Sequence, residues 1–333
     1  MHFFILGAGA IGCYVGGRLL AAGQQVTLVG RPRVLEPLAQ GGLQVSDLDG
    51  FSVQLAPAQL RLAHSLAEVS LQPPCVVLLC VKGGATESAA REIAAACPAG
   101  TPVISLQNGV DNLARIQSAA PQLQALPGMV PYNVVMPTPH SVRRATTGSL
   151  HVQRSAASEQ VAPLFAAAGL PMDLVDDMRA VQWGKLLLNL NNPVNALSDL
   201  PLRDELMGRG YRRVLAALQQ EALRAMDAAG IQPAKVGAAP PRLLPHILRL
   251  PDGLFKLVAA RMLRIDASAR SSMWDDLQLG RTTEIDDLCG AVVRLAQQHD
   301  VAAPRNAAMR ELILKHKMGQ RMSGKQMCRA LNI

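Results

Sequence analysis

Long hydrophobic runs are absent from this chain of 333 residues. The longest one, Cys75 to Val81, is far too short for a membrane helix, which needs about 20 apolar residues. Aromatic residues make up only 3% of the chain, and no stretch combines a dense basic face with interleaved aromatics, as nucleic-acid platforms do. Despite the net charge of +8, we therefore expect neither a membrane nor a nucleic acid as a partner.

Paired cysteines and clustered histidines are also missing. The six cysteines form no Cys-x-x-Cys pair, and the seven histidines have no spacing that would hold a metal. Most cysteines have apolar neighbours, which indicates buried free thiols in a reducing, cytoplasmic setting. The first residues lack a basic segment and their apolar run stops at glycines, so no secretory signal is expected.

Lysine is scarce among the 33 basic residues: there are seven lysines, and only Lys82 and Lys185 precede Lys235. Arginine is the usual basic residue of this chain. These two positions are therefore candidates for chemistry that needs an ammonium group.

What the chain does contain is an alternation of apolar strands and helices, and its length suits two domains of about 100–200 residues each. Continuous apolar runs separated by helical stretches indicate a parallel sheet covered on both faces. The expected strands are 2–6, 25–29, 75–81 and 101–106, with further strands within 128–152. We therefore expect an α/β Rossmann-type dinucleotide-binding domain at residues 1–174.

The pattern changes near Asp173 to helical periodicity. The expected helices are 178–190, 203–229, 255–264, 272–280, 283–299 and 306–318, and the proline-rich stretch 231–251 is expected to be irregular. An all-α C-terminal domain at 175–333 is therefore expected to follow the first domain.

A glycine-rich turn follows the first expected strand and opens a helix: Gly7-Ala8-Gly9-Ala10-Ile11-Gly12. In such a GxGxxG turn, Gly7 permits the tight bend, Gly9 lets a pyrophosphate approach the backbone, and Gly12 lets helix and strand pack closely. The helix N-terminus then offers free N–H groups to the phosphates. Within a repeating β–α pattern, the motif predicts dinucleotide binding by these six residues rather than a plain surface turn.

The residues after the second expected strand indicate which dinucleotide binds. An NAD site has Asp or Glu about twenty residues beyond the glycines to hold the ribose 2′-hydroxyl, but here the sequence is Gly30-Arg31-Pro32-Arg33. A carboxylate would repel the 2′-phosphate of NADP, whereas Arg31 can pair with it through two hydrogen bonds. We therefore expect NADPH/NADP+ as the cofactor; the alternative is that Arg31 and Arg33 are only exposed loop residues.

Two further polar residues follow expected strands, at the sheet edge where doubly wound folds bind ligands. Lys82 suits a cofactor phosphate or ribose, and Asn108 suits the nicotinamide ribose or the substrate. For Asn108-Gly109 the alternative is a simple turn.

Lys185, Asn189 and Asn192 are spaced by four and three and are expected to share one helical face. Such polar side chains are costly to bury unless they pair or line a cavity. A lysine there can polarise a carbonyl and donate a proton to the alkoxide that hydride transfer forms. The alternative is a solvent-exposed polar stripe, and Pro193 predicts a kink or interruption of the helix.

A last group of polar residues runs from Ser271 to Leu277 and from Gly280 to Asp286. Ser271, Thr282 or Thr283 can cap a helix that has an acid three residues on. Glu284 therefore has a structural alternative to a role in chemistry.

Together these motifs resemble the ketopantoate reductase family (2-dehydropantoate 2-reductase). The resemblance is carried along nearly the whole chain by GAGAIG at Gly7, Arg31, CVK at Lys82, QNG at Asn108, WGKLLLN at Lys185 and SSM…GRTTEID up to Glu284. It implies NADPH-dependent reduction of 2-dehydropantoate (ketopantoate) to (R)-pantoate, a step of pantothenate and coenzyme A biosynthesis. It also implies a Rossmann domain followed by a helical domain.

The resemblance further implies roles for individual residues. Lys185 resembles the family's general acid, and Glu284 resembles the residue that binds a substrate hydroxyl and orients the lysine. Asn108, Asn189 and Ser272 resemble the family's substrate contacts.

The chain departs from the family at one of these contacts. The family often has a further Asn eight residues beyond the lysine, but Pro193 occupies that position. Asn192 is expected in this role through a local shift, with Asn191 and Asn195 as alternatives.

A second departure is the long segment at about 230–266, whose apolar stretch Leu254 to Leu263 suits either a cap over the site or a homodimer contact. Because of this segment, the resemblance does not determine which keto acid is the substrate. The expected partner is a small-molecule 2-keto acid, either ketopantoate or another branched or bulkier one. A non-catalytic NADPH-binding protein is the remaining alternative.

Overall fold

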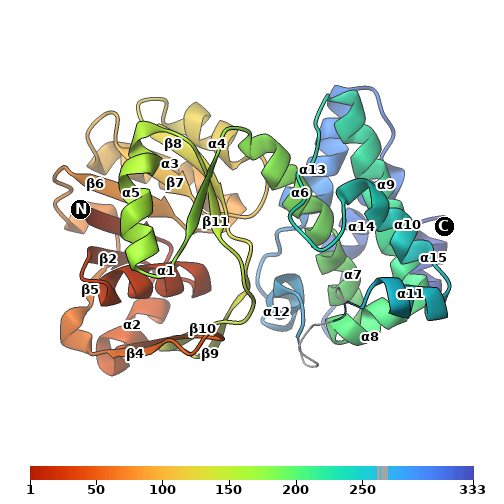
Figure 1. Cartoon of the computed structure of the whole chain (residues 1–333), viewed down its shortest axis with the longest axis horizontal. Coiled ribbons are helices and arrows are strands. Elements are labelled where there is room, and N and C mark those ends of the chain that lie inside the picture. Colours follow the sequence, from red (N-terminus) through yellow and green to blue (C-terminus); the bar gives the residue numbers. More distant parts are fainter. Residues whose placement is uncertain (261–262, 264–268) are drawn as a thin grey trace. The chain divides into compact units, whose positions relative to one another are not determined.

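A computed structural model describes residues 1–260, 263 and 269–333 of the chain. Residues 261–262 and 264–268 lie outside the described residues, and with them part of the segment 230–266, of the stretch Leu254 to Leu263 and of the expected helix 255–264. The chain divides into two compact units, Met1–Met178 and Arg179–Ile333 (Figure 1).

An eight-stranded sheet forms the centre of the first unit, with the strand order β12-β11-β8-β7-β6-β1-β2-β5 (Figure 1). Neighbouring strands are parallel except β8 and β11, which are antiparallel. The strands are β1 His2–Leu6, β2 Gln25–Val29, β5 Arg61–Ala63, β6 Cys75–Leu79, β7 Pro102–Ser105, β8 Gln124–Met129, β11 Leu150–Gln153 and β12 Met172–Val175. The sheet confirms the expected Rossmann-type class.

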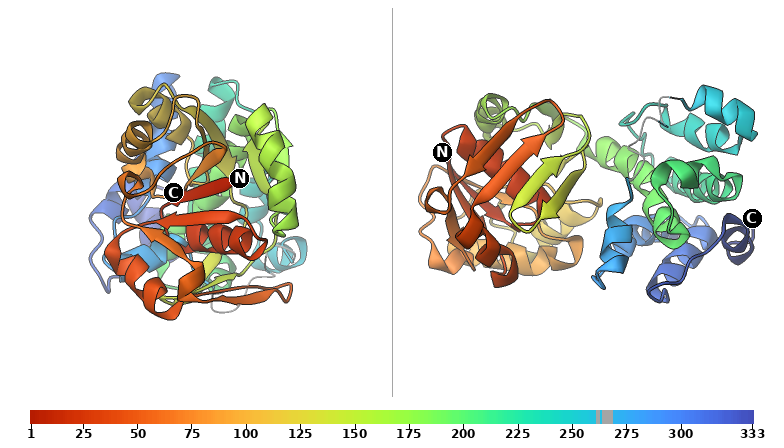
Figure 2. Two further views of the ribbon diagram at one scale, coloured as in Figure 1. Left: turned by 90° about the vertical axis from the view of Figure 1, so that its left-hand side faces the viewer. Right: turned by 90° about the horizontal axis from the view of Figure 1, so that it is seen from below.

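Alternate residues of the central strand β1 face opposite sides of the sheet. Phe3 and Ile5 belong to the core that includes residues of α1 (Ala10–Ala21) and α5 (Ala156–Ala167). Phe4 and Leu6 belong to a second core, with residues of α3 (Thr86–Ala96) and α4 (Asn112–Ala119). Helices therefore cover both faces (Figure 2), which explains the uninterrupted apolar sequence of β1.

A second, four-stranded sheet of the order β4-β3-β10-β9 completes the first unit. Its strands are β3 Leu43–Asp47, β4 Ser52–Leu55, β9 Val134–Thr138 and β10 Ser141–Arg144, and α2 (Pro32–Gly41) precedes them. The buried Asp47 carboxylate pairs with Arg18 of α1 at 2.8 Å and with Arg144 of β10 at 3.3 Å. This buried charge cluster ties the small sheet to the helix that follows the glycine turn.

Helices are the only regular elements among the described residues of the second unit, as expected. Its helices are α6 Met178–Asn189, α7 Asn191–Ser198, α8 Leu202–Met207, α9 Arg209–Ala228, α10 Leu244–Arg249, α11 Asp252–Val258, α12 Ser272–Gln278, α13 Ile285–Gln298, α14 Pro304–Leu314 and α15 Gly324–Ala330. The long helix α9 contacts α7, α8, α10, α13, α14 and α15. Across the described residues, no helix has both the length and the apolar character that a membrane span requires.

Two expectations for this unit are wrong. The stretch 203–229 is two helices, because Gly208 separates α8 from α9 with an extended backbone (φ −81°, ψ 109°). The stretch 231–251 is not irregular throughout, since it contains a 3-10 helix, Pro241–Leu243, and then α10. Pro241 and Pro245 stand in the first turns of these helices, where the N–H that proline lacks is not needed.

The fully buried Arg212 of α9 holds this proline-rich stretch in place. Its guanidinium donates hydrogen bonds to the carbonyls of Leu206, Met207, Leu248 and Leu250. It also pairs with Asp252 at 2.6 Å and lies 4.2 Å over the ring of Phe255. One arginine thus satisfies carbonyls at the C-terminal ends of α8 and α10, which a helix leaves without partners.

The predicted interruption near Pro193 is confirmed. Helix α6 ends at Asn189, Leu190 lies between the helices, and α7 begins at Asn191 with Pro193 in its first turn. A proline ring clashes with the carbonyl four residues before it and donates no hydrogen bond. The helix therefore cannot continue unbroken from Asn189.

Candidate active site

The glycine turn of the first unit packs tightly against the end of β6. A Cβ on Gly7, whose φ is +110°, would lie 2.7 Å from the main chain of Cys80 and of Val81. A Cβ on Gly12 would lie 2.1 Å from the carbonyl oxygen of Gly7. These two positions therefore need glycine for the fold itself.

Gly9 differs from the other two glycines of the motif, because no atom of a described residue other than its chain neighbours lies within 4 Å of the position that its Cβ would take. Gly9 is the N-cap of α1 and makes no side-chain cap hydrogen bond. The start of α1 thus combines an open surface with the positive end of a helix dipole. Such a cradle suits the pyrophosphate of a dinucleotide.

The end of β2 lies beside this turn. Gly7 and Ala8 donate main-chain hydrogen bonds to the carbonyl of Val29, and a Cβ on Gly30 would lie 3.0 Å from Cβ of Ala8. The next residue, Arg31, is the N-cap of α2, has an exposed side chain and uses it for no cap hydrogen bond. Its guanidinium is therefore available to a ligand at the edge of the turn.

Lys82 and Asn108 follow β6 and β7, as expected. Lys82 is exposed and Asn108 is half-buried. The loop at Asn108 is held by Gln107, which donates to the carbonyl of Val81 at 2.9 Å, and by Asn112, which donates to the carbonyl of Asn108 at 2.7 Å. These amides fix the loop more firmly than a simple turn.

Gln107 and Asn112 support the loop at Asn108, a role that was not expected from the sequence. Thr86 links them, because it accepts a hydrogen bond from Gln107 at 2.8 Å and donates one to Asn112 at 2.9 Å. In the sequence, only the position of Gln107 directly before Asn108 could have indicated this hydrogen-bond network.

In the second unit, Lys185 of α6 is half-buried, so a fully exposed polar stripe is excluded. Burial lowers the pKa of its ammonium to about 8, and the negative charge of Glu284 opposes that lowering. Such a lysine is protonated at neutral pH yet gives up its proton far more readily than a free one.

Glu284 stands at the N-cap of α13 and makes no side-chain cap hydrogen bond there. Its carboxylate instead interacts with the charge of Lys185. Ser271 does act as a cap, since its hydroxyl accepts from the N–H of Trp274 at 3.2 Å at the start of α12. Capping is therefore confirmed for Ser271, while the role of Glu284 in chemistry stays a prediction.

The expectation that Lys185, Asn189 and Asn192 share one helical face is wrong for Asn192. Lys185 and Asn189 lie on α6, but Asn192 lies beyond the break, on α7. Asn189 and Asn192 are both half-buried. Ser272, the first residue of α12, is exposed next to the capping Ser271.

Two of the alternatives for the shifted asparagine are engaged elsewhere. Asn191 donates to the buried carboxyl of Glu205 at 2.9 Å, and Asn195 donates to the carbonyl of Leu200 at 2.9 Å. Asn192 therefore remains the best candidate among the three for contact with a ligand.

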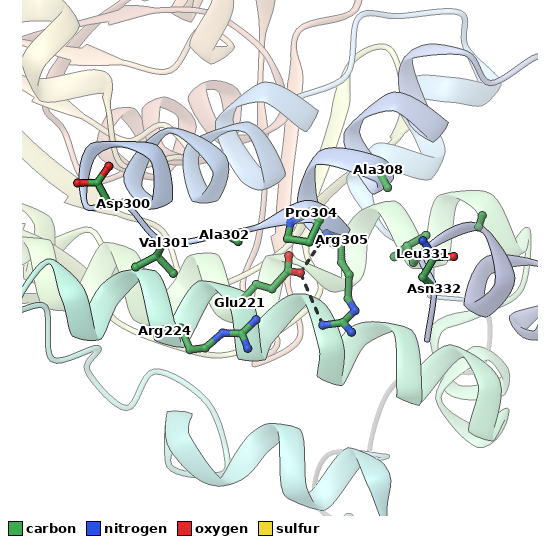
Figure 3. Close-up of a pocket in the computed structure, with 11 residues that line it drawn as sticks. Glu221, Arg224, Asp300, Val301, Ala302, Pro304, Arg305, Ala308, Leu331 and Asn332 are labelled. Carbon is green, nitrogen blue, oxygen red and sulfur yellow. Dashed lines mark hydrogen bonds and ion pairs between the residues drawn. The ribbon is translucent and has the colours of Figure 1, made fainter.

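One cavity of this unit, about 500 Å³ in volume, contains none of the expected site residues. Figure 3 shows the buried Glu221 of α9 in this cavity, where it accepts a hydrogen bond from the main-chain N–H of Arg305 at 3.0 Å. Glu221 also accepts a hydrogen bond from the main-chain N–H of Asn306 at 2.9 Å. Glu221 thus caps the start of α14 from outside that helix. This buried carboxylate, which the sequence reasoning also missed, holds α14 against α9.

A doubly wound α/β unit with a GxGxxG cradle, followed by a helical unit carrying a half-buried lysine, defines the class of two-domain Rossmann-fold oxidoreductases. Two family models cover the chain: "Ketopantoate reductase PanE/ApbA" matches residues 3–157, and "Ketopantoate reductase PanE/ApbA C terminal" matches residues 177–317. The chain belongs to the ketopantoate reductase family.

Individual relatives agree with this assignment. A 2-dehydropantoate 2-reductase from Halobacterium salinarum is 29% identical over 320 residues, 94% of this chain and 98% of the relative. The crystal structure of a PanE/ApbA family ketopantoate reductase from Ralstonia eutropha JMP134 is 30% identical, with a TM-score of 0.79 over 94% of this chain and 97% of that chain. A D-mandelate dehydrogenase bound to NADH and anilino(oxo)acetate, 21% identical, shares the fold with a TM-score of 0.78 over the full length of both chains.

Proposed function

We propose that this protein reduces 2-dehydropantoate to (R)-pantoate with NADPH, the reaction of pantothenate and coenzyme A biosynthesis. The observation that carries the proposal is the Lys185 ammonium, whose pKa burial lowers to about 8 beside the Glu284 carboxylate. Its place in a chain of the ketopantoate reductase family supports the choice of substrate.

The first unit fits a dinucleotide. The open surface at Gly9 would take the pyrophosphate against the start of α1, because a side chain would otherwise fill that space. Arg31 would hold the 2′-phosphate of NADP, and Lys82 would meet a phosphate or ribose. When bound, the nicotinamide supplies the hydride.

Lys185 would act on the substrate carbonyl. Its ammonium donates a hydrogen bond to the carbonyl oxygen, polarises the bond, and transfers a proton to that oxygen as negative charge develops. A pKa of about 8 suits this task, because the group is charged at neutral pH and the proton moves with little energetic penalty.

Glu284 would have two tasks. Its negative charge favours the protonated form of Lys185, and its carboxylate would accept a hydrogen bond from a hydroxyl of the substrate. Asn108, Asn189, Asn192 and Ser272 are the proposed polar contacts of the substrate, with Asn108 also suited to the nicotinamide ribose.

A panel of 2-keto acids tests the proposal. Purified protein should oxidise NADPH with ketopantoate at a higher kcat/KM than with 2-oxoisovalerate or benzoylformate, and the product should be (R)-pantoate. If the protein preferred the bulky benzoylformate, its proposed substrate would be another, bulkier 2-keto acid and not ketopantoate. Binding of NADPH without turnover of any panel member would indicate a non-catalytic NADPH-binding protein.

A further inference from the structure

A buried polar cluster lies behind the segment that carries Ser272. Its members are Asn191 and Asn195 of α7 and Glu205 of α8, and the side chains of Asn195 and Glu205 are fully buried. Both asparagines donate to Oε2 of Glu205, Asn191 at 2.9 Å and Asn195 at 3.4 Å. Asn195 also donates to the carbonyl of Leu200 at 2.9 Å.

The cluster reaches the candidate site through one hydrogen bond. Oδ1 of Asn195 accepts from the main-chain N–H of Ser271 at 2.9 Å, in a buried setting. The Ser271 hydroxyl donates to the carbonyl of Asn192 at 3.2 Å and caps α12. Ser272 is the next residue, so its place relative to α7 depends on how firmly Ser271 is held.

Stability alone does not account for this cluster. Oε1 of Glu205 and Oδ1 of Asn191 are buried with no hydrogen-bond partner among the described residues. Unsatisfied buried polar atoms are costly, and well-packed apolar residues often serve a helical core at least as well. A cluster that is polar in spite of this cost calls for a role besides packing.

We infer that Asn195, supported by Glu205, is a positioning residue that fixes Ser272 for binding of the keto acid. The inference rests on the proposed function, because it concerns the substrate contact made by Ser272. It does not concern the cofactor, whose expected contacts lie in the first unit.

The chemistry of Glu205 defines a conservative variant. Burial raises the pKa of this carboxyl to about 8, so at neutral pH it is mainly the uncharged acid. In E205Q an amide oxygen can accept from both asparagines as Oε2 does. E205Q should therefore keep the KM for ketopantoate within about twofold of the wild-type value.

The variant N195L removes the function of Asn195. Leucine has a similar volume but no polar atoms, and leaves the Ser271 N–H without its acceptor. N195L should raise the KM for ketopantoate about tenfold, with the Kd for NADPH within about twofold of the wild-type value.

E221Q is the matched control, because Glu221 is another buried carboxylate of this unit but contacts α14 instead of the Ser271 segment. A merely structural role would lower the fraction of folded enzyme, and so kcat, in E221Q and N195L alike without changing KM. A tenfold rise of KM in N195L, absent in E205Q and in E221Q, is the expected result. An unchanged KM in an active, folded N195L overturns the inference while the proposed function stands; a wild-type protein without turnover overturns both.

Discussion

Glu284 raises the pKa of Lys185 against the stronger lowering effect of burial, so the two side chains form one electrostatic unit although they come from distant parts of the chain. Lys185 lies on α6, and Glu284 lies at the start of α13. Because burial disfavours the ammonium and the carboxylate favours it, the proton affinity of Lys185 is set between that of a free lysine and that of an isolated buried one.

Removal of the lysine should abolish most catalysis. We expect K185A to lower kcat at least about 100-fold, since general acid catalysis is lost. The Kd for NADPH should stay within about twofold, because the expected cofactor residues lie in the first unit. The exposed Lys235 of the same unit is the control, and K235A should have wild-type kinetics. Normal turnover by K185A would remove lysine from the mechanism.

The electrostatic pairing predicts a pH profile. An acid catalyst works in its protonated form, so kcat/KM should be constant below the pKa of Lys185 and fall as the pH rises through about 8. E284Q removes the charge that raises this pKa, and the fall should therefore move to lower pH. Asp286, exposed and paired with Arg310, provides the control D286N, whose profile should match the wild type. If kcat/KM fell only near the pKa of a free lysine, this would contradict the assignment of Lys185, with its lowered pKa, as the acid catalyst.

Much of the Rossmann-type unit could be predicted because its determinants are local. The apolar run of β1 is buried on both faces, and the glycine turn follows it directly, so composition and order carry the signal. In the small sheet, β9 and β10 fall within the expected stretch 128–152, whereas β3 and β4 were not expected. Its attachment to α1 could not be predicted, because it depends on Asp47 joining Arg18 to Arg144 far along the chain. Likewise, α10 was missed because Arg212 of another helix satisfies its terminal carbonyl groups.

In the candidate site, too, some residues could be predicted from the sequence and others could not. Lys82, Asn108 and Lys185 stand out by residue type or by position after a strand. The supporting Gln107 and Glu205 do not, since each acts through partners that only the fold brings near. The expected single face through Asn192 failed because helical spacing takes no account of the break that Pro193 imposes.

Two glycines of the motif should respond differently to alanine. Gly9 has open space around the position of a Cβ and an ordinary φ of −80°, so G9A should keep the wild-type Tm. The added methyl group would occupy the surface proposed for the pyrophosphate, and the Kd for NADPH should rise about tenfold or more. G12A serves as the contrasting variant: its Cβ would lie 2.1 Å from the Gly7 carbonyl oxygen, and we expect a loss of about 2 kcal/mol or more in unfolding free energy. If G9A were strongly destabilised, the proposed difference between Gly9, kept for binding, and Gly12, required by the fold, would be refuted.

Selectivity for NADPH over NADH should depend on Arg31. Its side chain is exposed and makes no cap hydrogen bond, so R31A should leave stability unchanged. Loss of the pairing with the 2′-phosphate should raise the Kd for NADPH about 10- to 100-fold and leave the Kd for NADH unchanged. R91A, at an exposed arginine of α3, is the control for loss of positive charge. If R31A raised the Kd for NADPH and for NADH equally, Arg31 would not be the residue that recognises the 2′-phosphate.

Glu205 should make the stability of the protein depend on pH. Its folded-state pKa of about 8 lies above the ordinary value of 4.5, so between these values the folded chain retains a proton that the unfolded chain releases. The free energy of unfolding therefore falls as the pH rises from about 4.5 to 8, with a limiting slope of about 1.4 kcal/mol per pH unit, and levels off above. Burial raises the pKa of the Tyr211 hydroxyl on α9 above its ordinary value of 10.0, so this group stays uncharged over the same range.

E205Q removes this proton uptake. The Tm of E205Q minus that of the wild type should therefore increase as the pH is raised from 5 to 9. The gain follows from the sign of the linkage, since the variant no longer holds a buried carboxyl that must stay protonated to be stable. D204N, at the exposed neighbour on the same helix, controls for the change of net charge and should run parallel to the wild type. Thermal unfolding followed by circular dichroism across that pH range checks the prediction. Parallel Tm curves for E205Q and the wild type would mean that Glu205 does not take up a proton on folding.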